Sequence, residues 1–117
     1  MVAATSRLED DGRRDLRVQA GVWLRARREE LNMSQRELAE SVGTLYYTFI
    51  SQIEGGRGRI PPERYAAWAE ALKIEQRDFA ICMLQFYEPA THALIFGDTV
   101  YVDEKSDGRG HELHSAL

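Results

Sequence analysis

Four hydrogen-bonding side chains recur at helical spacing near the middle of the sequence, in the stretch YYTFISQIE. They are Tyr47, Thr48, Ser51 and Gln52, at positions i, i+1, i+4 and i+5, so a helix would carry them on one face. Hydroxyl and carboxamide groups on one helix face match the donors and acceptors that base edges expose in the major groove of DNA. A carboxamide such as that of Gln52 can pair in two places with adenine. The four residues therefore predict a base-reading helix.

The apolar residues of the same stretch predict where this helix begins and which face is buried. Tyr46, Ile50 and Ile53 recur at i, i+4 and i+7, which favours a helix from Leu45 or Tyr46 to Glu54 with these three side chains facing inward. Leu45 is expected to seal the preceding turn. For the tyrosine pair two roles stay open: each phenol contacts DNA, Tyr46 at a phosphate, or each ring is a core or rim aromatic that covers the preceding helix.

A shorter helix is predicted just before this stretch, in SQRELAESVG. Ser34 followed three residues later by Glu37 is a capping box, in which the hydroxyl and the carboxylate bind free amides of the first turn. Gly43 suits the left-handed residue that ends a helix. Two short helices joined by a tight glycine turn, the second exposing a polar strip, form a helix-turn-helix.

The stretch MSQRELAESVG…FISQIEGGRGRIP resembles the XRE family of bacterial and phage repressors, the lambda-repressor and Cro-like helix-turn-helix proteins. The matching features are the Ser-Gln start of the first short helix, ELA, the glycine turn, ISQIE and the Gly/Arg segment before proline. The resemblance covers about residues 17–75. It implies an all-α, five-helix lambda-repressor-like domain that binds double-stranded DNA.

The turn of this motif departs from the family pattern. Ten residues separate Gly43 from Glu54, where family members usually have one fewer. Counting back from Glu54 puts Tyr47 and Thr48 where the family's first base-contacting pair lies. Counting forward from Gly43 would move that pair to Tyr46 and Tyr47. We adopt the backward count, because helix geometry fixes it.

The resemblance also implies contacts with the DNA backbone. Ser34 and Gln35 resemble the family's phosphate clamp, at the positively polarised start of a helix. Arg57 and Arg59, in the glycine-rich loop after the reading helix, are expected to bind further phosphates. Arg36 stays open between a phosphate ligand and a solvated helix residue.

Composition and periodicity divide the chain into four parts. Residues 1–15 are polar and are expected to form a flexible N-terminal arm, and residues 98–117 a flexible acidic tail. Residues 16–75 are predicted to be the helix-turn-helix DNA-binding domain, with its first helix beginning at Leu16. Residues 76–97 are predicted to be a C-terminal helix and an apolar segment that forms a dimer contact.

The predicted fifth helix, Gln76 to Tyr87, is stopped by Pro89 and carries six consecutive apolar residues, Phe79 to Leu84. A small domain buries only one side of such a helix, so we expect a second subunit to cover the remainder. The predicted homodimer contacts are Phe79, Met83, Phe86, Leu94, Ile95 and Phe96. Helix-turn-helix dimers bind half-sites about 34 Å apart. The alternative is that the segment THALIFG folds back over the fifth helix.

The charge distribution is compatible with nucleic acid at the middle of the chain. The formal net charge is −4, but residues 13–64 hold ten Lys/Arg against seven Asp/Glu, whereas residues 65–117 hold four against nine. The charge of the contact surface matters more for binding than the charge of the whole chain.

Other functional classes have little support in the sequence. No glycine-rich phosphate loop follows a predicted strand and no nucleophile–base pair is evident, so we expect neither an enzyme nor a cofactor. His111 and His114 lack cysteine or carboxylate support in register, so we expect no metal site. No apolar run approaches the ~18 residues of a membrane span, and no signal peptide is evident. Together with the single cysteine, Cys82, this predicts a cytoplasmic protein without a membrane partner.

The sequence thus predicts a sequence-specific DNA-binding transcriptional regulator, acting as a dimeric repressor. One alternative is an antitoxin that binds a toxin with its C-terminal region and regulates its own operon. Another is a protein-interaction module that has kept the fold and lost DNA binding, which the acidic net charge keeps open.

Overall fold

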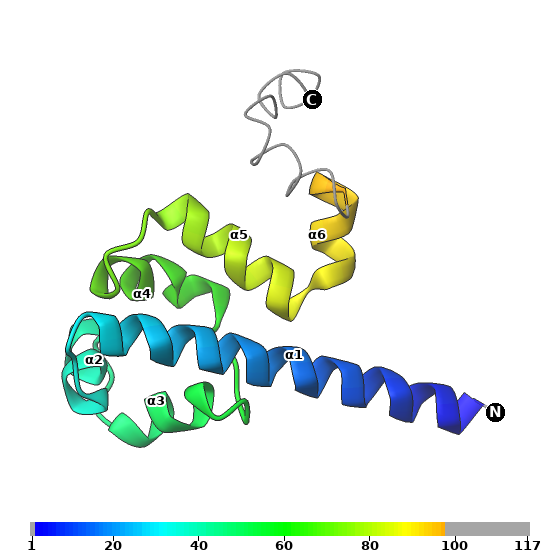
Figure 1. The fold of residues 1–117 in the computed structure, drawn as a ribbon, viewed down its shortest axis with the longest axis horizontal. Helices are drawn as coiled ribbons and strands as arrows, with labels where there is room; N and C mark the ends of the chain where they lie inside the picture. Colours follow the sequence, from blue (N-terminus) through cyan, green and yellow to red (C-terminus); the bar gives the residue numbers. More distant parts are fainter. Residues whose placement is uncertain (1, 98–117) are drawn as a thin grey trace.

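The computed structural model describes residues 2–97, with side chains from residue 12 onward, and this part of the chain contains helices and no strands (Figure 1). The elements are α1 (Val2–Glu30), α2 (Gln35–Val42), α3 (Tyr47–Glu54), the 3₁₀ turn η1 (Pro62–Arg64), α4 (Tyr65–Ala71), α5 (Gln76–Tyr87) and α6 (Pro89–Phe96). The predicted all-α fold is confirmed, with a sixth α-helix beyond the five predicted. The predicted acidic tail, residues 98–117, lies outside the described residues.

Helix α1 runs through the fold, with α3 packed against one side and α5 against the other (Figure 1). Helix α2 packs against both α3 and α4, and α4 packs against α5. The largest fully buried side chains come from all five of these helices and the loops between them: Leu24, Leu38, Ile50, Ile53, Ile60, Trp68, Leu72, Phe79 and Met83. Burial of apolar surface, at roughly 25 cal/mol per Å², is the main source of stability for such a core.

The first helix begins at Val2, not at Leu16 as predicted, so from Val2 onward the expected arm is the first half of α1. The added segment contains no proline and a single glycine, Gly12. Because a docked helix can be extended without a new nucleation step, continuation of α1 into this segment is physically reasonable. The N-terminal part of α1 extends past the other helices (Figure 1). Neither α1 nor any other helix in residues 2–97 is both long and apolar enough to cross a membrane.

The local signals that predicted α2 are confirmed. The Ser34 hydroxyl accepts a hydrogen bond from the Glu37 amide at 3.0 Å, and the Glu37 carboxylate accepts one from the Ser34 amide at 2.7 Å. Gly43 has φ = 81°, the left-handed conformation that ends the helix. Arg64, the last residue of η1, donates to the Val42 carbonyl at the same end. Both ends of α2 are therefore fixed by specific hydrogen bonds.

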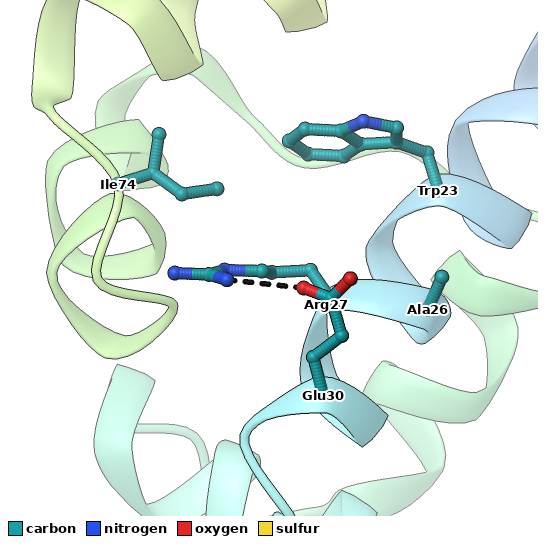
Figure 2. Close-up of a pocket in the computed structure, with 5 residues that line it drawn as sticks. All are labelled: Trp23, Ala26, Arg27, Glu30 and Ile74. Atoms are coloured by element: carbon teal, nitrogen blue, oxygen red, sulfur yellow. Dashed lines mark hydrogen bonds and ion pairs between the residues drawn. The ribbon is translucent and has the colours of Figure 1, made fainter.

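The Arg27 side chain of α1 binds the turn between α4 and α5. Figure 2 shows Arg27 with Glu30 and the residues that line the hollow beside it. Arg27 donates from Nε to the Leu72 carbonyl at 2.9 Å and from Nη2 to the Lys73 carbonyl at 3.2 Å. Its Nη1 is 3.0 Å from a Glu30 carboxylate oxygen. These bonds satisfy carbonyl groups at the end of α4, which a helix leaves without partners. The open hollow beside the guanidinium is lined by Trp23, Ala26 and Ile74.

The C-terminal part also departs from the prediction. Helix α5 has the predicted bounds, but Pro89 also starts a new helix, α6, which packs against α5. Proline suits this position, because the first turn of a helix has no partner for its amide. Residues 89–96 therefore lie against their own α5.

Two of the predicted dimer contacts were wrong. Phe79 and Met83 have no exposed surface, because α1 and α4 both pack on α5 and enclose them within one protomer. Phe86 is half-buried, with its ring centroid 6.5 Å from that of Trp23. The other predicted contact residues lie on α6, where Leu94 and Ile95 are exposed and Phe96 is half-buried.

The backbones of α1 and α3 meet at Gly21. A Cβ added to Gly21 would lie 2.2 Å from the Glu54 carbonyl oxygen and 2.8 Å from that of Ile53. Both obstructing atoms belong to the backbone, so neither can rotate away. The absence of a side chain at Gly21 therefore determines how closely the two helices pack.

We expect Gly21→Ala to lower the free energy of unfolding by about 1–3 kcal/mol, the cost of overpacking a well-packed site. Gly12→Ala in the same helix is the matched control, since nothing lies within 4 Å of its added Cβ. That substitution should be neutral or stabilise the protein by up to about 1 kcal/mol, because alanine favours helix more than glycine does. Urea denaturation monitored by circular dichroism measures the free energy of unfolding of both variants. Equal effects of the two substitutions would contradict the close approach.

Candidate nucleic-acid interface

The four residues predicted to read bases lie together on the outer face of α3. Tyr47 is 40% exposed, Thr48 and Gln52 are exposed, and Ser51 is half-buried. The opposite face is buried, through Ile50, Ile53 and Glu54. The polar strip and the apolar strip of this helix are thus separated as the sequence predicted.

The start of α3 corrects the prediction for the residues before it. The helix begins at Tyr47, and Tyr46 is its extended N-cap residue, with φ = −120°. Leu45, expected to seal the turn, is 89% exposed, and Tyr46 is 69% exposed, so the inward-facing alternative for Tyr46 was wrong. The longer turn places both in the loop, and Phe49 packs against the core from within the helix instead. Tyr47 and Thr48, the pair given by the count back from Glu54, therefore lie in the first turn of α3.

A buried ion pair fixes the C-terminal end of α3 to α1. Arg28 Nε lies 2.6 Å and Nη2 lies 3.0 Å from the two carboxylate oxygens of Glu54, and both side chains are less than a tenth exposed. Arg28 Nη1 also donates to the Met33 carbonyl at 2.7 Å. Hydrogen bonding to Glu54 raises the pKa of the Arg28 guanidinium, although burial acts to lower it. A two-pronged, charge-assisted contact of this kind orients the helices as well as joining them.

The predicted phosphate clamp at the start of α2 takes part in this network. Gln35 is half-buried, and its amide nitrogen donates to the Glu54 carboxylate at 3.0 Å. Ser34 is exposed, with its hydroxyl and amide bound to Glu37 in the capping box. Gln35 therefore links the start of α2 to the end of α3. The sequence analysis did not predict the Arg28–Glu54 pair. A signal was present, because each residue lies four positions after a buried residue and therefore on the buried face of its helix.

The two arginines predicted to bind phosphates have different surroundings. Arg57 is exposed and follows α3 directly. Arg59 pairs with Glu88 at 3.0 Å, and its guanidinium lies 4.6 Å from the centre of the Tyr87 ring. The Tyr87 hydroxyl accepts a hydrogen bond from the Ile60 amide at 3.3 Å, and burial raises the pKa of Tyr87. Arg59 thus connects the loop after α3 to the junction of α5 and α6.

A contact that the sequence did not predict lies at the other end of α3. The Arg36 guanidinium, on α2, lies over the ring of Tyr47, with 4.5 Å between Cζ and the ring centroid. Helix α3 has no side-chain hydrogen bond at its N-cap. The Arg36–Tyr47 contact therefore bridges the two short helices across the turn.

No metal or nucleophile site emerges from the described part of the chain. Residues 12–97 contain no group of three or more His, Cys, Asp or Glu side chains placed to hold a metal ion. His111 and His114, the histidines weighed as metal ligands from the sequence, lie outside the described residues. Burial raises the pKa of the Cys82 thiol to about 11, which disfavours the reactive thiolate.

Comparison with protein families agrees with this geometry. Residues 24–77, from α1 to the first turn of α5, match a helix-turn-helix family model. They are a helix-turn-helix domain of the XRE/Cro/C1 type. The domain implies DNA binding and a role in transcription regulation. No match was found among curated proteins or among solved structures.

We expect Glu54→Ala to lower the free energy of unfolding of the helix-turn-helix domain by about 3–5 kcal/mol, because it leaves the Arg28 charge buried without its partner. Glu29→Ala is the matched control, since Glu29 forms an exposed pair with Arg25 at 3.1 Å. The Glu29→Ala substitution should change the free energy of unfolding by less than about 1 kcal/mol. Thermal and chemical denaturation measure both variants. A Glu54→Ala protein as stable as the Glu29→Ala protein would contradict the structural role of the pair.

Proposed function

We propose that this protein is a sequence-specific, double-stranded DNA-binding transcriptional repressor that acts as a homodimer. The supporting observation is the division of α3 into a buried face, joined to α1 through Gly21 and the Arg28–Glu54 pair, and an outer polar face. A helix held rigidly on one side and polar on the other fits the major groove, which admits a single α-helix.

The outer side chains supply chemistry suited to base reading. Gln52 would bind an adenine through both groups of its carboxamide, and Thr48 has a methyl group for contact with thymine and a hydroxyl for hydrogen bonds. Ser51 would add a hydroxyl at the centre of the strip. Tyr47, at the first turn, would offer its phenol and its ring. Each good two-point contact provides roughly 1–3 kcal/mol of discrimination between bases.

Contacts with the DNA backbone would position α3 in the groove. We assign them to Ser34, Gln35 and Tyr46 on one side of α3, and to Arg57 on the other. Arg59 would join them only by giving up its pair with Glu88, so Arg57 is the stronger candidate in this loop. Phosphate contacts orient a protein on DNA but carry no sequence information themselves.

Repression follows from occupancy of promoter DNA, which needs no second activating surface. Dimer formation would double the contacts and match a two-fold operator with half-sites about 34 Å apart. We assign the dimer contact to α6, where Leu94 is 87% and Ile95 is 50% exposed. These two neighbouring apolar side chains would supply the apolar centre of such a contact.

The same α6 surface favours a second candidate, an antitoxin that binds a toxin protein there and regulates its own operon. Residues 65–117 carry four basic against nine acidic residues, so a basic partner would be attracted to this half of the chain. A neighbouring toxin gene and a heterodimer in solution would favour this candidate over the homodimer.

We expect Gln52→Ala to lose roughly 10- to 100-fold in preference for the operator while keeping its affinity for random duplex. The probe is duplex DNA from upstream of the protein's own gene, titrated at two salt concentrations. Native binding should weaken steeply as salt rises, because phosphate contacts release counterions. Gln85→Ala, the same change at an exposed position of α5, should bind as the native protein does.

Three results of this titration have different meanings. Loss of preference in Gln52→Ala alone supports base reading by α3. Native protein that shows no preference between the upstream duplex and random duplex would exclude regulation of its own gene. Native protein that binds no duplex even at low salt would refute the proposed function.

Leu94→Ser is expected to shift the protein from dimer to monomer, because it removes an exposed apolar contact without disturbing the core. Leu45→Ser is the matched control, since Leu45 is equally exposed but lies in the turn before α3. Sedimentation equilibrium over a range of concentrations measures both. If the native protein is a monomer both in solution and on a two-half-site duplex, the dimer is wrong.

A further inference from the structure

We propose that Arg36 is a positioning residue of the DNA interface. From α2, it fixes the ring of Tyr47 at the start of the reading helix and presents its remaining N–H groups to a DNA phosphate. One side chain would thereby couple a backbone contact to the orientation of a base-reading residue. This inference rests on the proposed function. It goes beyond the phosphate contact that the sequence left open for Arg36, because it adds the orientation of Tyr47, which neither the sequence pattern nor the family match assigns.

The geometry places both groups at the surface that would face DNA. Arg36 is exposed on the first turn of α2, and Tyr47 is the first residue of α3. The Arg36 Cζ atom is 4.5 Å from the centre of the Tyr47 ring. The contact therefore spans the turn that connects the two helices.

Arg36 has no carboxylate partner among the described residues, a property that it shares with Arg57 but not with most arginines of this region. Arg25, Arg27, Arg28 and Arg59 each form an ion pair with a glutamate. Among the ion pairs of residues 12–97, none includes Arg36. A guanidinium over the face of a ring is attracted by the ring without using a hydrogen bond, so its N–H groups remain available to phosphate oxygens.

The longer turn before α3 explains what the Arg36–Tyr47 contact would stabilise. Because Leu45 and Tyr46 are exposed, the residues that precede α3 provide little packing to fix its first turn. The N-cap has no side-chain hydrogen bond either. Stacking by Arg36 would restrict the Tyr47 ring before DNA arrives and so reduce the entropy lost on binding.

The test is a double-mutant cycle on DNA affinity, with the salt dependence measured for each protein. Arg36→Ala should bind the upstream duplex more weakly and reduce the slope of log K against log salt by about 0.9, the value for one phosphate contact. Arg36→Lys should keep the slope, because the charge remains, but lose part of the operator preference, because an ammonium does not stack as a plane. Arg77→Ala, an exposed arginine of α5, should behave as the native protein does.

The coupling to Tyr47 is read from the same cycle. The affinity losses of Arg36→Ala and Tyr47→Ala should not multiply: the double variant should bind roughly two- to fivefold more tightly than the product of the two losses predicts. Tyr47→Phe keeps the ring, so Arg36→Ala should have its full effect in that background. Circular dichroism and thermal unfolding of each variant exclude loss of folding as the cause.

The possible results separate this inference from the proposed function. If Gln52→Ala loses preference as expected but Arg36→Ala keeps the native affinity and salt slope, the role of Arg36 is refuted and the proposed function stands. If Arg36→Ala changes the slope but its effect multiplies with that of Tyr47→Ala, Arg36 binds phosphate without positioning the ring, and the coupling is refuted. If the native protein binds no duplex, both proposals are refuted.

Discussion

The contact between the end of α3 and the middle of α1 determines the orientation of the candidate reading helix. Gly21 allows the two backbones to touch, and the Arg28–Glu54 pair joins them in the buried space beside that contact. A buried ion pair carries a large desolvation cost, so its geometry and its additional hydrogen bonds decide whether it stabilises the fold. Here the Met33 carbonyl and the Gln35 amide provide those additional bonds. The network links α1, α2 and α3 in one arrangement.

The other helices fix the position of α1 and thereby stabilise its contact with α3. Helix α5 packs on the side of α1 away from α3, and Arg27 binds the carbonyls at the end of α4. Helix α2 is attached to α4 through packing and through the bond from Arg64 to the Val42 carbonyl. These attachments leave Tyr47, Thr48 and Gln52 exposed on the outer face of α3.

The ion pairs reduce the number of basic side chains that can contribute positive charge to the candidate interface. The ten basic residues of positions 13–64 suggested a basic surface, but several of them are neutralised by glutamates within the fold. Arg59 is paired at the junction of α5 and α6. Arg36 and Arg57 are the exposed basic side chains that flank α3, one on each side of it along the chain. Positive charge near the candidate interface therefore comes from a few residues, which makes each of them important for salt-dependent binding.

The sequence by itself determined the features that depend on neighbouring residues. The capping box at Ser34, the left-handed Gly43 and the polar strip of α3 could all be predicted, because hydrogen bonds to nearby amides and helical periodicity are local. Only the tertiary structure decided which groups from distant segments meet. The Arg28–Glu54 pair, the enclosure of Phe79 by α1 and α4, and the Arg36–Tyr47 contact depend on how helices pack, and no local pattern encodes that packing. The extra residue in the turn is a further example. The spacing from Gly43 to Glu54 revealed that the turn is longer, but only the packing of the helices determined that Tyr46 is exposed.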